Sequence, residues 1–253
     1  MKYILSIVFT LILSSTTFAA GKTIPYEIAG EAFEGYMVSP SKKAPLVLLI
    51  HDWDGLTDYE VKRSEMLADL GYAVFAADLY GKDVRPTARA DKKRITGELY
   101  KDRARMRSLL EGALSAAKAK GFDTSNAVAI GYCFGGTAVL ELARSGADLK
   151  AFVTFHGGLG IPEGQDYSKT RGEVLVFHGS ADSAVTMDDF ADLARALEEK
   201  KVRHEMISYS GAPHAFTIFG SKRYHEEADR KSWARFVDYL AHLFARNGVE
   251  HVN

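Results

Sequence analysis

Short apolar runs alternate with longer amphipathic segments along the chain. The amphipathic segments predict helices at residues 58–70, 98–120, 136–145, 187–200 and 221–246. The apolar runs, at 46–50, 73–77, 126–130, 150–155, 173–177 and 203–208, have the length of strands. Several are apolar at consecutive positions, which is typical of strands buried on both faces of a parallel sheet. With a leading hairpin at 23–28 and 32–38, the pattern predicts an α/β fold: a mostly parallel, doubly wound sheet with helices on both faces.

Residues 1–19 have the pattern of a secretory signal peptide. A lysine precedes an apolar stretch at 3–13, and Thr17 and Ala19 supply the small residues expected before a cleavage site. The apolar stretch is shorter than the ~20 residues that cross a bilayer, so an uncleaved anchor is the weaker interpretation. We therefore expect an exported protein, periplasmic or secreted, whose mature part, residues 20–253, is a single α/β domain.

Composition and charge exclude several classes of function. The 33 acidic and 32 basic side chains nearly cancel, so the chain has no global positive field for nucleic acid or an anionic membrane. One cysteine cannot form an intramolecular disulfide or a thiolate cluster for zinc or iron–sulfur. No histidine pair has the spacing of a helical metal site, so we expect no metal.

The loop after the run at 126–130 has the pattern of a nucleophile elbow. It reads GYCFGG at 131–136, and a predicted helix follows. In such a unit, glycines relieve crowding around a strained nucleophile, and the helix N-terminus favours a thiolate. The backbone N–H of Phe134 is directed toward the place where an oxyanion would form. We therefore expect Cys133 to be a catalytic nucleophile; the alternative is a small, buried packing residue.

A thiol nucleophile needs a base, and the base needs an orienting carboxylate. Asp182 follows the run at 173–177, and His214 lies between the last predicted strand and the last helix, so chain order predicts a triad with Cys133. Asp182 has the alternative of a turn or N-cap residue, and His214 that of a surface histidine. His51 and His156 also follow strands and are candidates to line the pocket, with His156 the next candidate for the base.

Four segments together resemble the dienelactone hydrolase family. They are GYCFGG at 131–136, GYAV and ADLY within 71–80, HGSAD at 178–182 and GAPHAF at 211–216. The likeness spans about residues 45–245 and implies the α/β-hydrolase fold. It places Cys133, Asp182 and His214 where the family has its catalytic triad. The loop HDWDG at 51–55 matches the family segment that completes the oxyanion hole, which implies a second donor at the Trp53 N–H.

The chain departs from the family pattern at two positions that concern substrate binding or regulation. Asp52 stands where the family has a Glu that touches the resting thiol, and its shorter side chain is expected to lose that contact. Ile218 stands where a substrate-binding Arg occurs, so a carboxylated lactone would lose a bidentate partner. We therefore expect a preference for neutral esters, unless Arg85, Arg89 or Arg94 supplies a replacement charge.

These features predict a dienelactone hydrolase-like enzyme that cleaves a small carboxylic ester or lactone. The triad would form a thioester acyl-enzyme, and the reaction needs no cofactor. Two alternatives use the same residues: an acyltransferase in which an acceptor other than water resolves the thioester, and an exported, non-catalytic binding protein with an inert Cys133. We expect no nucleic acid or membrane partner for the mature chain, and the sequence leaves the oligomeric state open.

Overall fold

The computed structural model describes residues 20–245; the predicted signal peptide at 1–19 lies outside them. Within this range, eight strands form one sheet in the order β1-β2-β4-β3-β5-β6-β7-β8. The strands are β1 (Lys22–Ile28), β2 (Glu31–Val38), β3 (Leu46–Ile50), β4 (Ala73–Ala77), β5 (Ala127–Tyr132), β6 (Ala151–Phe155), β7 (Glu173–Gly179) and β8 (His204–Tyr209). β1 and β2 form the expected antiparallel hairpin, β2 pairs antiparallel with β4, and every other pair is parallel.

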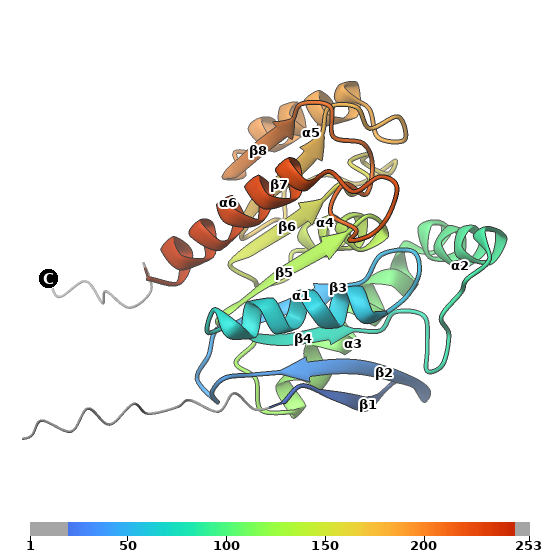
Figure 1. Ribbon diagram of the computed structural model, residues 1–253, viewed down its shortest axis with the longest axis vertical. Coiled ribbons are helices and arrows are strands. Elements are labelled where there is room, and N and C mark those ends of the chain that lie inside the picture. Colours follow the sequence, from blue (N-terminus) through green and yellow to red (C-terminus); the bar gives the residue numbers. More distant parts are fainter. Residues whose placement is uncertain (1–19, 246–253) are drawn as a thin grey trace, which may run out of the picture.

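Helices cover both faces of this sheet, as the doubly wound pattern predicts (Figure 1). α1 (Asp58–Asp69) and α6 (Glu226–Ala245) pack on one face. α3 (Arg103–Ala119), α4 (Phe134–Ser145) and α5 (Met187–Glu199) pack on the other. β3 and β4 are buried at every position, and their side chains pack against helices on both faces of the sheet. This explains why these runs are apolar without alternation.

One predicted helix is wrong. The expected single helix at 98–120 is two helices, α2 (Arg89–Lys101) and α3, separated at Asp102. The Asp102 side chain accepts a hydrogen bond from the Arg105 N–H at 2.8 Å and so caps the start of α3. α2 buries only Thr96 and Leu99, so it has no apolar stripe that would reveal it in the sequence.

The last helix also starts later than predicted. α6 begins at Glu226, because a turn joining the Tyr224 N–H to the Ser221 oxygen occupies the preceding residues. Over residues 20–245, no helix combines the length and apolar character that crossing a bilayer requires.

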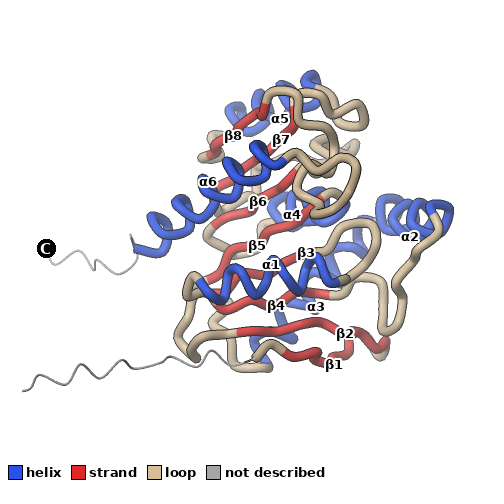
Figure 2. The backbone as a smooth tube through the Cα atoms, viewed as in Figure 1, coloured by secondary structure: helices blue, strands red, loops and turns tan. Residues whose placement is uncertain are grey.

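The parallel strands bring the chemistry-bearing loops to one edge of the sheet. The loops after β3, β5, β6, β7 and β8 all leave the carboxyl ends of neighbouring strands, as the tube in Figure 2 shows. These loops contain Asp52, Cys133, His156, Asp182 and His214. In a sheet of this topology the carboxyl edge is where ligands bind.

Candidate active site

Cys133 occupies a strained turn between β5 and α4. Its φ and ψ are 52° and −113°, a region that costs a non-glycine residue about 1–3 kcal/mol. The Cys133 N–H donates to the Phe155 oxygen at 3.0 Å, which holds the turn against β6. A Cβ at Gly135 would stand 2.3 Å from the Ile50 oxygen, so only glycine allows α4 to start this close to β3. The local sequence therefore produces the elbow predicted for it.

The structure brings the three predicted triad residues into one hydrogen-bonded chain. His214 Nε2 lies 3.1 Å from Cys133 Sγ, and His214 Nδ1 lies 2.7 Å from Asp182 Oδ2. The other carboxylate oxygen of Asp182 accepts the N–H groups of Ala184 and Val185 at 2.8 and 3.0 Å. Asp182 is thus fixed by its own turn while it orients the imidazole.

The electrostatics of this chain favour a charged imidazole. Burial on its own lowers the pKa of His214, but the hydrogen bonds to Asp182 and Cys133 outweigh it and raise that pKa to about 10. Burial raises the pKa of Asp182, but the hydrogen bonds from His214 and Val185 hold it below its usual value. His214 therefore carries a proton at neutral pH, and an imidazolium beside a thiol favours the thiolate.

Two backbone amides border the nucleophile. Phe134 is the first residue of α4. Its N–H therefore has no hydrogen-bond acceptor within the helix. Trp53, in the loop after β3, lines the same cavity as Cys133, and its N–H meets no acceptor within residues 20–245. These are the two amides that the sequence indicated as oxyanion donors.

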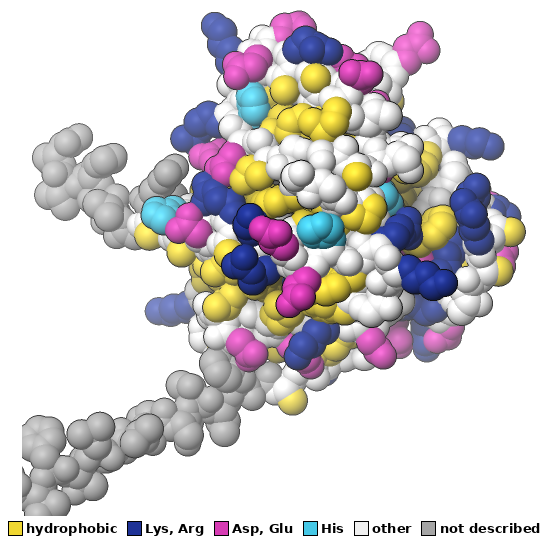
Figure 3. Space-filling view, turned by 45° about the horizontal axis from the view of Figure 1, so that its top comes forward, with side chains coloured by type: hydrophobic (Ala, Val, Ile, Leu, Met, Phe, Trp, Pro, Cys, Tyr) yellow, Lys and Arg dark blue, Asp and Glu magenta, His cyan; other side chains and the backbone are white. Residues whose placement is uncertain are grey.

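A cavity of about 390 Å³ opens beside Cys133 and His214. It is lined by Asp52, Trp53, Asp54, Arg89, Lys92, Cys133, Ala184, His214, Ala215, Ile218, Ser221 and Arg223. Ile218 therefore faces the cavity, as its place after His214 indicated. Basic side chains also gather on the right of the face shown in Figure 3, the side on which α2 lies in Figure 1.

Of the three arginines that were candidates for a replacement charge, Arg89 lines the cavity. Lys92 and Arg223 line it as well, and the sequence pattern did not indicate either of them. Lys92 pairs with Asp54 at 2.5 Å, whereas no acidic group of residues 20–245 lies within ion-pair distance of Arg89 or Arg223. Two guanidinium groups are thus available to an anionic ligand, and Ile218 does not make the cavity neutral.

The other candidate arginines lie elsewhere. Arg85 donates to the Leu56 oxygen and pairs with Asp78, so it ties the loop after β4 to the loop after β3. Arg94 pairs with Asp91 and Glu98 along the surface of α2. Lys92 was missed because it lies on the helix that the sequence did not predict. Arg223 lies in the loop that carries His214, and that proximity was the available signal.

Asp52 lines the cavity without a hydrogen bond to the thiol. Its Oδ1 accepts the Asp54 N–H at 2.7 Å, and its own N–H donates to Glu60 Oε1 at 3.3 Å. Glu60 is the N3 residue of the capping box of α1, where it accepts the N–H and hydroxyl of Thr57. Burial, then the nearby Asp52 charge, raises the pKa of Glu60 to about 8, and burial likewise raises that of Asp52.

Neither alternative histidine lines the cavity. His51 Nδ1 lies 2.6 Å from the Asp52 oxygen and its Nε2 accepts the Leu79 N–H, so it joins two loops. His156 is buried behind His214, with the two ring centroids 5.5 Å apart. Its Nε2 lies 2.8 Å from Thr217 Oγ1, so it is not placed to act directly on Cys133.

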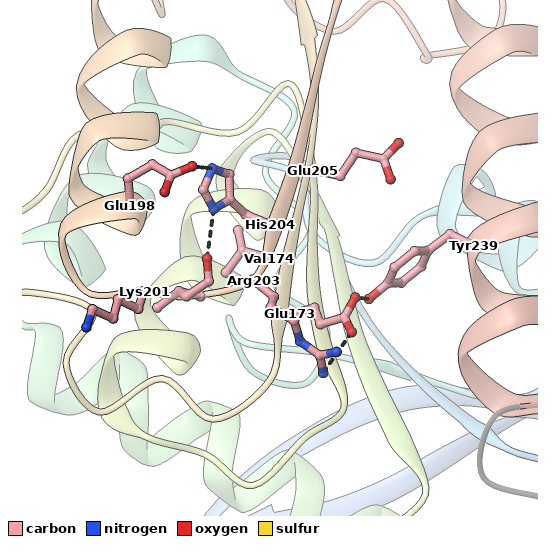
Figure 4. Close-up of a pocket in the computed structure, with 9 residues that line it drawn as sticks. Glu173, Val174, Glu198, Lys201, Arg203, His204, Glu205 and Tyr239 are labelled. Atoms are coloured by element: carbon pink, nitrogen blue, oxygen red, sulfur yellow. Dashed lines mark hydrogen bonds and ion pairs between the residues drawn. The ribbon is translucent and has the colours of Figure 1, made fainter.

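A larger cavity, of about 490 Å³, lies at the opposite edge of the sheet. Glu173 and His204, the first residues of β7 and β8, border it, and Figure 4 shows Glu173 between Arg203 and Tyr239. Arg203 pairs with Glu173 at 3.0 Å, and His204 with Glu198 at 3.7 Å. Most of its charged groups are paired, with Glu205 paired to Arg235 outside the cavity, and no cysteine lines it.

Comparisons with known proteins agree with this geometry. The family model described as "Dienelactone hydrolase family" matches residues 33–244. A solved dienelactone hydrolase-like promiscuous phosphotriesterase from metagenomic libraries is 32% identical, with a TM-score of 0.82 and coverage of 88% of this chain and 98% of that one. A Salmonella typhimurium protein, provisionally named a carboxymethylenebutenolidase, is 23% identical over 87% of this chain and 86% of its own length. A thermophilic esterase of Thermogutta terrifontis shares the fold, at a TM-score of 0.64 and 20% identity over 88% of this chain and 93% of its own.

Proposed function

The chain belongs to the dienelactone hydrolase family, and on that premise we propose that it hydrolyses carboxylic esters or lactones through a thioester on Cys133. The observation that carries the proposal is the hydrogen-bonded chain from Cys133 Sγ through His214 to Asp182 at the wall of a cavity. A nucleophile, a base and an orienting carboxylate in this order are what acyl transfer requires.

In the first half of the proposed reaction the Cys133 thiolate attacks the substrate carbonyl carbon. The carbonyl oxygen becomes an oxyanion, which the Phe134 and Trp53 amides stabilise. Collapse of the tetrahedral intermediate breaks the bond to the alkoxy oxygen, and His214 protonates the departing alkoxide. For a lactone, the alcohol stays attached to the acyl group as its hydroxyl end.

In the second half, His214 accepts a proton from water as that water attacks the thioester carbonyl. The second tetrahedral intermediate expels the thiolate and leaves a carboxylic acid. Asp182 holds the imidazole in the tautomer that each transfer needs. An acceptor alcohol in place of water would make the enzyme an acyltransferase, and product analysis with added alcohols separates these outcomes.

The cavity favours substrates that carry a negative charge away from the scissile bond. Arg89 and Arg223 lie beside it without an acidic partner in the described part of the chain, so a carboxylate would gain charge-assisted hydrogen bonds there. This replaces the preference for neutral esters that Ile218 indicated. A phosphotriester is the second substrate class, favoured by the 32% identity to the phosphotriesterase.

Trapping of the acyl-enzyme tests the proposal. Wild-type protein mixed with an aryl ester and quenched in acid should have the acyl group on the Cys133 peptide in mass spectrometry. Cys133→Ala should show neither the adduct nor turnover, and His204→Ala, at the other edge of the sheet, should retain both. Full turnover by Cys133→Ala would refute the thioester mechanism.

We further propose that the enzyme works outside the cytoplasm as a single domain of residues 20–253. The support is the export pattern of residues 1–19. Intact mass of the protein from the periplasm or medium tests this, since cleavage after Ala19 predicts a new N-terminus at Ala20.

A further inference from the structure

We infer that Thr217 is a positioning residue for His214, a role that rests on the proposed function. Thr217 belongs to a buried network behind the His214 ring, and the other members come from α1, the loop after β6 and α6. Thr217 lies three residues after His214 and is fully buried. Ala215, between them, has a φ of 61°, in the left-handed region that disfavours side chains. A strained backbone beside His214 keeps its shape only where the surroundings hold it.

The Thr217 hydroxyl joins two other elements at this point. It lies 2.7 Å from the Tyr59 hydroxyl, which α1 supplies, and 2.8 Å from His156 Nε2, in the loop after β6. The loop's own backbone hydrogen bonds include those from the Ile218 N–H to the Ala215 oxygen, from the Ser221 N–H to the Ile218 oxygen and from the His225 N–H to the Phe216 oxygen. The hydroxyl thus connects the loop to the body of the protein directly behind the imidazole.

A buried arginine also contacts this network. Arg63 Nε donates to the Tyr59 oxygen at 3.2 Å, and a guanidinium can only donate. The Thr217 hydroxyl has one proton and can also accept, so it can bond the Tyr59 hydroxyl and His156 Nε2 at the same time. His156 Nδ1 has no hydrogen-bond partner among residues 20–245, so a charged ring would leave a buried N–H unpaired, and we expect a neutral ring.

The same arginine is anchored at its other end. Its Nη2 donates to the Thr217 backbone oxygen at 3.1 Å and pairs with Asp229 of α6, with both side chains of the pair nearly inaccessible to water. The guanidinium also stacks on Phe219, at 4.3 Å from the ring centre. Arg63 therefore contacts the loop of His214 directly at the Thr217 backbone oxygen, and it reaches the Thr217 hydroxyl through Tyr59.

A neutral His156 matters because its ring is packed against His214. Burial, then the charge on His214, holds the pKa of His156 well below its usual value, in agreement with a neutral ring. The ionisable groups that face this pair of rings or the Thr217 hydroxyl are Cys133, Asp182, His178, Tyr59, Arg63, Tyr132 and Asp229. The network thus fixes the position of His214 without placing a second cation beside it.

The experiment compares Thr217→Val with Thr217→Ser. Valine keeps the shape of threonine but removes the hydroxyl, so kcat for an aryl ester should fall about 10- to 100-fold, with KM changed less than about twofold. Serine restores the hydroxyl and should recover most of kcat. The matched control is Thr170→Val. The Thr170 hydroxyl bonds the Ala143 oxygen at the far end of α4, so this variant should leave kcat unchanged.

Alkylation of Cys133 by iodoacetamide provides a readout that does not depend on hydrolysis. Near pH 7 the reaction depends on His214 to stabilise the thiolate, so Thr217→Val should react several-fold more slowly than wild type. At about pH 10, where a thiol ionises without help, the two should react equally. Tyr59→Phe, which removes the hydroxyl that bonds Thr217, should shift kcat and alkylation in the same directions, less strongly.

Equal kcat and equal alkylation near pH 7 in Thr217→Val and Thr217→Ser would overturn the positioning role. So would a uniform slowing of alkylation at both pH values, which would indicate general damage to the fold. If the wild type hydrolyses no ester, the proposed function fails, while the pH dependence of alkylation still decides whether Thr217 positions His214.

Discussion

The cavities at the amino and carboxyl ends of the parallel strands differ in how far their charged side chains are paired. At the amino ends of β7 and β8, most of the charged groups that border the larger cavity are paired, as Arg203 is with Glu173. At the carboxyl ends, the smaller cavity has two arginines without acidic partners in residues 20–245 and a thiol at 3.1 Å from an imidazole. Volume alone would select the wrong end.

Backbone strain is concentrated at the carboxyl ends. Cys133, His156 and Ala215 all have positive φ and lie in loops at the carboxyl ends of strands, whereas Lys201 alone among the residues bordering the amino-end cavity has positive φ. Such conformations cost free energy, and they persist where packing and hydrogen bonds hold them. Three strained residues around a thiol that is hydrogen-bonded to an imidazole distinguish the candidate active site from the amino-end cavity.

Among substitutions at the carboxyl-end cavity, Asp182→Asn is expected to have the largest effect on kcat. An amide cannot orient the imidazole in the required tautomer, so kcat should fall about 10³- to 10⁴-fold while the Tm stays within a few degrees. Steady-state kinetics on an aryl ester and thermal unfolding measure the two effects. Glu198→Gln, at the amino-end cavity, is the control and should leave kcat unchanged.

The Asp182→Asn variant also tests the pKa of His214. The Asp182 hydrogen bond raises that pKa, so its loss should let His214 deprotonate at lower pH. Iodoacetamide labelling of Cys133 near pH 7 should then slow relative to wild type. A near-normal kcat with normal labelling would show that another group orients His214.

A smaller difference is expected from the unpaired cations. Arg223→Gln removes a charge from the cavity, so kcat/KM for a carboxylated ester should fall about tenfold, and that for its neutral methyl ester less than about twofold. The two substrates serve as internal controls for each other. Arg203→Gln, in the amino-end cavity, should change neither value, and equal losses on both substrates would contradict the charge argument.

The smallest effect is a pH dependence of stability from Glu60. Its pKa is raised in the folded state from 4.5 to about 8, so the folded protein holds this proton more tightly than the unfolded chain. That stabilisation is complete below the unfolded pKa and is lost as the pH rises toward 8. The Tm of the wild type minus that of Glu60→Gln should therefore fall by a few degrees between about pH 5 and pH 8.

A difference in Tm that does not change over this range would show that Glu60 is ionised throughout. The matched control is again Glu198→Gln, because the Glu198 side chain is 78% exposed. Its difference from wild type should stay constant over the same range.

The fold was predictable because its signals are local. Buried strands such as Leu46–Ile50 are apolar runs, and the order of Cys133, Asp182 and His214 along the chain follows from where parallel strands end. α2 was not predictable, since a helix that buries two side chains has no apolar stripe. Lys92, which lies on this helix, was missed for the same reason.

The hydrogen-bond network behind His214 could not be predicted from the local sequence pattern. Tyr59 and Thr217 are separated by 158 positions in the sequence, and their contact depends on how α1 crosses the sheet. Nothing about an isolated Thr in a loop distinguishes it from a solvent-exposed one. Only the packed structure shows that its hydroxyl lies behind the imidazole.

The weak attachment of α2 has an evolutionary consequence. This helix carries Arg89 and Lys92 to the cavity, yet it buries only Thr96 and Leu99 and stands away from the sheet in Figure 1. Tyr100 of this helix packs on Phe134, with ring centroids 5.6 Å apart, so the exposed positions of α2 are freer to vary than Tyr100 or the elbow, whose glycines touch backbone. Recombination of this one helix among relatives is therefore a short route to new substrate ranges on an unchanged catalytic frame.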